Sequence, residues 1–148
     1  MGDKKYIKLT KKKVQEVFQI CNEKYFDNKI SLPDRIELWT PSNKCVGWIR
    51  AVWDMKRRKF VTALHISQQF KWTYENLEHT IVHEMIHMEN KDYLIKLPFW
   101  KRLFGLDHDK KFVARMNEIN EKYGLNITVR AKHMKTEMIK TKKGATSL

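Results

Sequence analysis

The chain has 148 residues, 42% of them hydrophobic, which suits one folded domain and excludes a globally disordered protein. The spacing of its two cysteines, Cys21 and Cys45, excludes a CxxC zinc ribbon, and no apolar run approaches the roughly 20 residues that a membrane-spanning helix needs. The net charge of +13 leaves a polyanionic partner open.

The first periodic segment predicts a helix that starts after Thr10. The hydroxyl of Thr10 can accept a backbone N–H of the first turn, and Asp27 with Asn28 is typical of a helix end. Between them the apolar side chains recur at helical spacing, so one face of the helix should pack on the core. That face comprises Val14, Val17, Phe18, Cys21 and Tyr25.

Three later segments have the alternation, or the β-branched and aromatic content, of strands. A short strand is expected around Ile36 and Leu38, followed by longer ones at 46–53 and 59–66. The polar turn at 54–58 predicts that the two longer strands form an antiparallel hairpin. We therefore expect one three-stranded, mainly antiparallel sheet.

Two further helices are expected after the sheet. One begins at Thr73 and runs through His87, with apolar residues over half its circumference, so it should be largely buried. The other starts from Asp109 and stops at Gly124. The segment 93–104 mixes apolar, basic and proline residues, and we assign it no element. The apolar stripe of the last helix comprises Phe112, Met116, Ile119 and Tyr123.

The middle of the first of these two helices carries the sequence HExxH, from His83 to His87. Residues four apart stack about 6 Å up the axis of a helix, so both imidazoles can reach the same metal ion. Glu84 then flanks the open side of the metal. Because the chain has only six histidines, a chance match is improbable, and we favour zinc over two surface histidines beside a salt-bridged glutamate.

A catalytic zinc needs a third protein ligand and an open position for water. His79 continues the histidine stripe but lies about 12 Å along the axis from His87, so we expect it beside the ligands or on the surface. His65 sits on a strand, where a core position is as plausible, and His133 lies in the basic tail. We choose His108, just before the last helix, as the third ligand because the intervening segment can return it to the metal.

These residues also carry a family resemblance, which spans most of 14–124. They are similar to the SprT-like metalloprotease domain. The resemblance implies a zincin-like α+β fold in which the two HExxH histidines and a later histidine bind zinc and the glutamate is catalytic. It also implies proteins attached to DNA as substrates. His108 matches the position of the later histidine. The segments that carry the resemblance are 78–87, 108–112, 116–120, 25–28 and the strand of Gly47.

We therefore predict a zinc metalloendopeptidase. Its Zn²⁺ ligands are His83, His87 and His108. Glu84 is the catalytic residue, which takes a proton from the attacking water and later protonates the leaving amine. An extended substrate is expected along the edge strand of the sheet. Candidates for an oxyanion donor are Tyr93, Tyr123 and Arg130.

Two other functions stay open. The alternative to the peptidase is a non-catalytic, zinc-containing nucleic-acid-binding module, but a structural site has no use for a carboxylate between two ligands. Hydrolysis of a non-protein amide or ester ranks last.

The charge pattern predicts the domain organisation. Residues 1–13 hold six Lys against one Asp, and residues 128–148 hold six Lys or Arg against one Glu, so each end carries +5. The body, 14–127, carries only +3. Basic ends bind polyanions but are also common as solvated segments. We expect a metallopeptidase domain at 14–127 between a basic arm and a basic, disordered tail, in a cytoplasmic monomer whose Lys-rich ends contact DNA.

Overall fold

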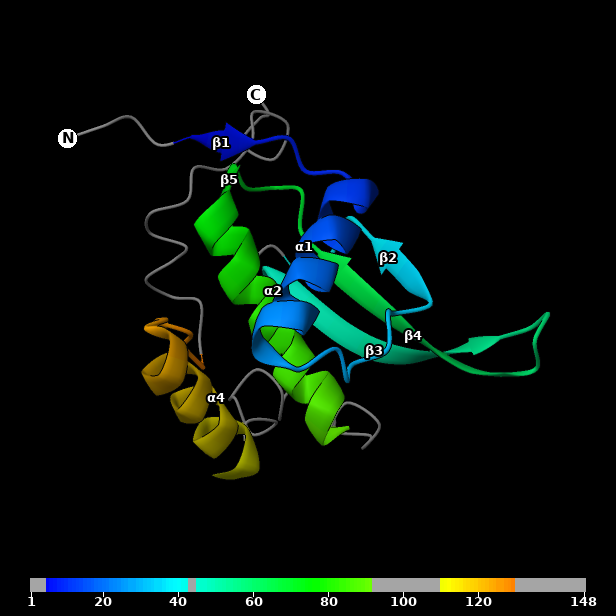
Figure 1. The fold of residues 1–148 in the computed structure, drawn as a ribbon. Coiled ribbons are helices and arrows are strands. Elements are labelled where there is room, and N and C mark those ends of the chain that lie inside the picture. The colour runs from blue at the N-terminus through cyan, green and yellow to red at the C-terminus, as the bar shows by residue number, and fades with distance from the viewer. Residues whose placement is uncertain (1–4, 43–44, 92–109, 130–148) are drawn as a thin grey trace.

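The structure, a computed structural model, describes residues 5–42, 45–91 and 110–129. Its architecture is α+β, as the sequence predicts. Figure 1 shows α1 and α2 lying together over the sheet, with α4 next to α2. The elements are β1 (Tyr6–Ile7), α1 (Lys11–Tyr25), β2 (Arg35–Glu37), β3 (Gly47–Asp54), β4 (Lys59–Ile66), β5 (Trp72–Thr73), α2 (Tyr74–Asn90) and α4 (Lys110–Tyr123).

Helix α1 forms as expected from its cap and its apolar stripe. The Thr10 hydroxyl accepts the backbone N–H of Lys13 at 3.0 Å, a contact that stabilises a helix by about 1 kcal/mol. Asp27 and Asn28 both take left-handed conformations, and the N–H of Asn28 donates to the carbonyl of Asn22 at 2.9 Å, which ends the helix. The buried residues are those of the predicted stripe, Val14, Val17, Phe18, Cys21 and Tyr25.

The hairpin forms as expected, and the whole sheet is mixed. Strands β3 and β4 pair antiparallel from Gly47 with Ile66 to Asp54 with Lys59. Strand β2 instead runs parallel to β4, which gives the order β2-β4-β3. A residue pattern indicates which side chains are buried but not the direction of a partner, because that depends on the route of the chain. In this order β3 is an edge strand of the described sheet.

A second, two-stranded sheet joins the start of the chain to the start of α2. Strands β1 and β5 pair antiparallel, with Tyr6 opposite Thr73 and Ile7 opposite Trp72. We did not expect these strands from the sequence, because each has only two residues and shows no alternation. The pairing holds the N-cap of α2 in place.

Helix α2 begins where predicted and is buried on almost all sides. The Thr73 hydroxyl accepts the N–H of Asn76 at 3.1 Å, and the helix continues past His87 until Lys91 adopts a left-handed conformation. It packs against α1, α4, β3 and β5. A fully buried aliphatic side chain contributes about 1.5–3 kcal/mol, so the helix is fixed firmly. Its fully buried apolar residues are Leu77, Ile81, Val82, Met85 and Ile86.

Helix α4 packs its predicted stripe on α2. Phe112, Met116 and Ile119 are buried, whereas Tyr123 is partly exposed and meets the ring of Tyr25 edge-on at 4.9 Å. Gly124 follows with a φ of +66°, the left-handed stop that its position predicts. Asp109 and the unassigned segment 93–104 lie outside the described residues. None of the helices in the described ranges has the length and hydrophobicity required to cross a bilayer.

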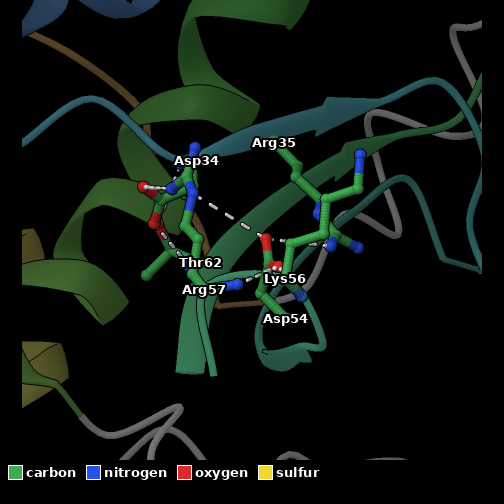
Figure 2. Close-up of polar contacts among 6 residues, drawn as sticks. All are labelled: Asp34, Arg35, Asp54, Lys56, Arg57 and Thr62. Atoms are coloured by element: carbon green, nitrogen blue, oxygen red, sulfur yellow. Dashed lines mark hydrogen bonds and ion pairs between the residues drawn. The ribbon is translucent and has the colours of Figure 1, made fainter. Parts of the chain in front are cut away.

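Two aspartates hold the turn between β3 and β4 (Figure 2). Asp54 Oδ1 accepts the backbone N–H groups of Lys56 at 2.9 Å and Arg57 at 3.0 Å. Asp34 Oδ2 accepts the backbone N–H of Thr62 at 2.9 Å, and Arg57 Nη1 lies 3.3 Å from its other oxygen. The pKa of each carboxyl lies below its ordinary value, mainly because the carboxylate accepts a backbone N–H. For Asp54 this is the N–H of Arg57, and for Asp34 it is the N–H of Thr62.

The lowered pKa values predict acid-sensitive stability. A carboxyl with a depressed pKa in the folded state stabilises the protein above its unfolded pKa of about 4, and this contribution is lost as pH falls through the folded value. We expect the double variant Asp34→Asn, Asp54→Asn to have a lower melting temperature than the wild type at pH 7. Its melting temperature should also fall less than that of the wild type between roughly pH 5 and 2.

The measurement is thermal unfolding by circular dichroism across that pH range. Asp27→Asn, at the exposed end of α1, is the matched control and should leave the pH profile as it is in the wild type. A double variant that still follows the wild-type acid profile would contradict the role of these two carboxylates.

Candidate functional site

Helix α2 carries a row of polar side chains within its buried surface. Glu84 and His87 are only 6% and 5% exposed, His79 is also buried, and His83 is half-buried. Placing such groups in an apolar interior costs free energy unless they are hydrogen-bonded or bind a ligand. Their concentration on one helix therefore marks a candidate functional site.

The two predicted metal ligands of this helix lie next to each other. The rings of His83 and His87 are 5.1 Å apart, on consecutive turns, at an angle of 67°. Phe112 from α4, fully buried, packs on both rings, at 4.9 Å from His83 and 4.4 Å from His87. The phenyl ring restricts the rotamers of both imidazoles and gives the site an apolar wall.

A backbone carbonyl orients His83. Its Nδ1 lies 2.9 Å from the carbonyl oxygen of Thr128. A carbonyl can only accept, so Nδ1 carries the hydrogen, and in a neutral imidazole the lone pair is then on Nε2. This is the arrangement in which a histidine presents Nε2 to a metal while its other nitrogen is fixed by a backbone carbonyl.

The position of Thr128 depends on Asn120. The Asn120 side chain donates to the carbonyl of Ile127 at 2.9 Å and accepts its N–H at 2.8 Å. This two-point contact folds the chain back after Gly124 and brings the next residue to His83. Thr128, which we assigned to the basic tail from the charge pattern, thus contacts the site.

Glu84 lies against the first residue of the edge strand β3. A Cβ atom on Gly47 would come within 2.7 Å of Thr80 Cγ2 and 3.1 Å of Glu84 Oε2. Real Cβ atoms essentially never approach other atoms as closely as the first of these distances, so the strand can approach α2 here only because residue 47 is glycine. The carboxylate is therefore held at one end of β3.

The predicted third ligand, His108, lies outside the described residues. Among residues 5–42, 45–91 and 110–129, no group of three His, Cys, Asp or Glu side chains is suitably placed to hold a metal ion. The described part of the chain brings together His83 and His87 and places Glu84 beside them on α2.

His65 is a core histidine. It is fully buried between Trp39 and Trp48, with ring distances of 4.5 and 4.8 Å. Arg50 Nε donates to its Nε2 at 2.9 Å, so Nδ1 carries the hydrogen that the Trp39 carbonyl accepts at 3.0 Å. Burial first, and then the charge of Arg50, lowers the pKa of His65. Both nitrogens are used by the protein, so His65 cannot serve as a metal ligand in this conformation.

Sequence reasoning missed three contributors to the site. Phe112 was recognised only as part of a core stripe, the Thr128 carbonyl has no side-chain signal, and the close approach at Gly47 is a tertiary contact. The contact of Asn120 with Ile127 was not predicted either, because Asn120 is one of several polar residues near the end of α4. Of the oxyanion candidates, Tyr93 and Arg130 lie outside the described residues.

Comparison with known proteins gives one match. Residues 14–133 match the model of the SprT-like family, a range that includes His83, Glu84, His87 and the Thr128 contact. No curated protein matches the chain.

The Asn120 contact leads to a prediction about metal affinity. Asn120→Ala should release Ile127 and Thr128, leave His83 less well oriented, and weaken zinc binding by roughly tenfold, the lower end of what loss of such supporting contacts costs. Zinc affinity is measured on the folded protein by competition with a chromophoric chelator.

Asn22→Ala is the matched control, because Asn22 makes the same two-point contact with Ile30, through its carbonyl at 2.7 Å and its N–H at 3.1 Å, after α1. Both variants should lose stability, but only Asn120→Ala should lose zinc affinity. Equal affinities in the two variants would show that Asn120 does not position the site.

Proposed function

The chain belongs to the SprT-like family, and on this premise we propose that it is a zinc-dependent metalloendopeptidase with a zincin-like active-site helix. The observation that carries the proposal is the pair of neighbouring imidazoles on α2, with His83 oriented by the Thr128 carbonyl. Glu84 follows His83 on the same helix, where hydrolysis needs a carboxylate and a structural zinc site does not.

The donor set on α2 suits zinc. Two imidazoles one helical turn apart can bind the same ion, and the Nδ1 contact of His83 leaves its Nε2 as the coordinating nitrogen. We propose His108 as the third protein ligand. Zn²⁺ held by His83, His87 and His108 would supply a Lewis acid that lowers the pKa of water and polarises the scissile carbonyl.

Glu84 is proposed as the group that moves protons. Its carboxylate is buried on α2, next to the ligand His83 and in contact range of the start of β3. It accepts a proton from the attacking water and then delivers it to the amine of the departing peptide. Because Gly47 brings the strand close, Glu84 is held against rotation and ready for both transfers.

We propose that the substrate is an extended polypeptide bound along β3. This edge strand begins at Gly47, beside Glu84, so a peptide that pairs with it is led to the carboxylate. Pairing through the main chain recognises the backbone rather than a particular sequence. This suits proteins associated with DNA, which the Lys-rich ends would recruit.

We propose the oligomeric state and the cellular compartment from the charge distribution and the cysteines. The domain at 14–127 would act as a monomer between two basic ends. Both cysteines are thiols, and burial raises the pKa of Cys21 to about 12, so this thiol resists oxidation. Cysteines that remain thiols instead of forming a disulfide suit a reducing compartment such as the cytoplasm.

The ligand assignment predicts the zinc content of variants. His83→Ala, His87→Ala and His108→Ala should each lose zinc or bind it at least 100-fold more weakly, because each removes one of three protein ligands. His79→Ala and His65→Ala should keep one zinc per chain. Metal analysis of the purified proteins distinguishes the two groups, and a His108→Ala protein that retains full zinc would remove His108 from the site.

The role of Glu84 predicts a separation of activity from structure. Glu84→Gln should retain the fold and the zinc but lose at least 100-fold in peptide hydrolysis, because the amide cannot carry the proton. Cleavage of an unfolded reporter protein is measured for wild type and variant, with and without single-stranded DNA. Near-wild-type activity in Glu84→Gln would reject the mechanism, and zinc without cleavage in the wild type would favour the nucleic-acid-binding module.

A further inference from the structure

The far end of the β3–β4 hairpin extends beyond the helices (Figure 1). Two aromatic side chains are exposed there. Trp53 and Phe60 are cross-strand partners, 48% and 60% exposed, with rings 5.2 Å apart at 75°. They lie on the same face of the hairpin as Ile49 and Leu64, which are buried under the helices. The apolar face of the sheet thus continues past the helical layer and presents a rigid aromatic pair to solvent.

The turn that joins these two strands is basic. Met55 is followed by Lys56, Arg57, Arg58 and Lys59, all of them exposed. Within the described part of the chain, Lys56, Arg58 and Lys59 form no ion pair, whereas Arg57 pairs with aspartates.

The acidic groups of this region are already engaged. Asp54 accepts backbone N–H groups of the turn and lies 3.5 Å from Arg35, and Asp34 is held by Thr62 and Arg57 (Figure 2). Arg35 and Arg57 therefore balance the charge of the two carboxylates, and Lys56, Arg58 and Lys59 remain in excess. The surplus positive charge is at the tip, and it faces solvent.

Arg58 is not required by the turn. Its φ is 54°, in the left-handed region, where glycine is tolerated better than a side chain. A glycine would suit the backbone at this position, so the guanidinium can be removed without harm to the turn. This permits a test in which binding and folding change in opposite directions.

We propose that this hairpin end, defined by Trp53, Lys56, Arg58, Lys59 and Phe60, binds single-stranded nucleic acid. Exposed aromatic faces stack unpaired bases, and nearby cations contact the backbone phosphates. In a duplex the bases are already stacked on each other, so a single strand is preferred. The cations occupy the tip itself and the rings lie behind them, so a bilayer would meet charge before apolar surface, which disfavours a lipid partner.

This surface is separate from the proposed hydrolytic site, and its residues are not part of the Lys-rich ends of the sequence. Gly47 and Asp54 are the two ends of β3, eight residues long, which places the hairpin end about 20 Å from Glu84 at roughly 3.3 Å per residue. A bound strand would leave the peptidase site open. The proposal concerns binding alone, so it stands or fails independently of proteolysis.

Fluorescence anisotropy with a labelled oligothymidylate of about 16 nucleotides tests the aromatic part. Trp53→Leu with Phe60→Leu keeps apolar side chains but removes the stacking faces, and the full-length variant should bind roughly tenfold more weakly. Its dependence on salt should not change, since no charge is lost. Trp53→Phe with Phe60→Tyr, which keeps aromatic faces, should restore most of the affinity.

The basic part is tested by Lys56→Gln, Arg58→Gly and Lys59→Gln in one protein. Its affinity should fall by at least tenfold and its salt dependence should become less steep, because fewer counterions are released. The matched control removes the same charge from exposed positions elsewhere, by Lys29→Gln, Lys71→Gln and Lys122→Gln. Its affinity and its salt dependence should both stay near the wild-type values. Arg58→Gly alone should bind more weakly and melt at the same temperature as the wild type or higher.

Three results would overturn the proposal. The Leu variant could bind the oligonucleotide as tightly as wild type, or the hairpin and control charge variants could be equally affected, which would assign binding to the Lys-rich ends and net charge. Binding to vesicles of phosphatidylserine and phosphatidylcholine that survives the Leu substitutions, without oligonucleotide binding, would identify a membrane surface instead.

Discussion

The structure depends on the burial of α2 between α1, α4 and β3. A helix enclosed in this way should be apolar throughout, yet α2 includes two histidines and two glutamates that are almost inaccessible to solvent, and a third histidine that is half-buried. Helix α1 holds Glu78, because the Tyr25 hydroxyl donates to its carboxylate. Strand β3 approaches closely at Gly47, α4 provides Phe112, and the segment after α4 provides the Thr128 carbonyl. The fold thus gives these polar groups one fixed arrangement.

The site is therefore built from three parts of the chain that are distant in sequence. His83 on α2 and Thr128 are separated by 45 residues, and their contact in turn rests on the hold of Asn120 on Ile127. Such a linkage ties the orientation of an imidazole to the docking of α4. A change that displaces α4 would therefore disturb the contact between the Thr128 carbonyl and His83.

Strand β3 joins the two surfaces to which we assign functions. One end, at Gly47, touches Thr80 and Glu84, and the other end forms the hairpin with the exposed pair Trp53 and Phe60. The strand is rigid because it pairs with β4 along its whole length and because aspartates fix the turn. A nucleic acid at one end and a polypeptide at the other would therefore be held at a constant separation.

The sequence alone determined the helices, the hairpin and the HExxH pair, because these depend on local spacing: apolar periodicity, the caps Thr10 and Thr73, and two histidines one turn apart. It also identified the family, now shown by the match over residues 14–133. Only the tertiary structure decided that β2 runs parallel to β4, that Gly47 touches Glu84, and that the Thr128 carbonyl selects the His83 tautomer. These contacts join segments far apart in the chain, and a backbone carbonyl or a close approach leaves no side-chain pattern from which it could be predicted.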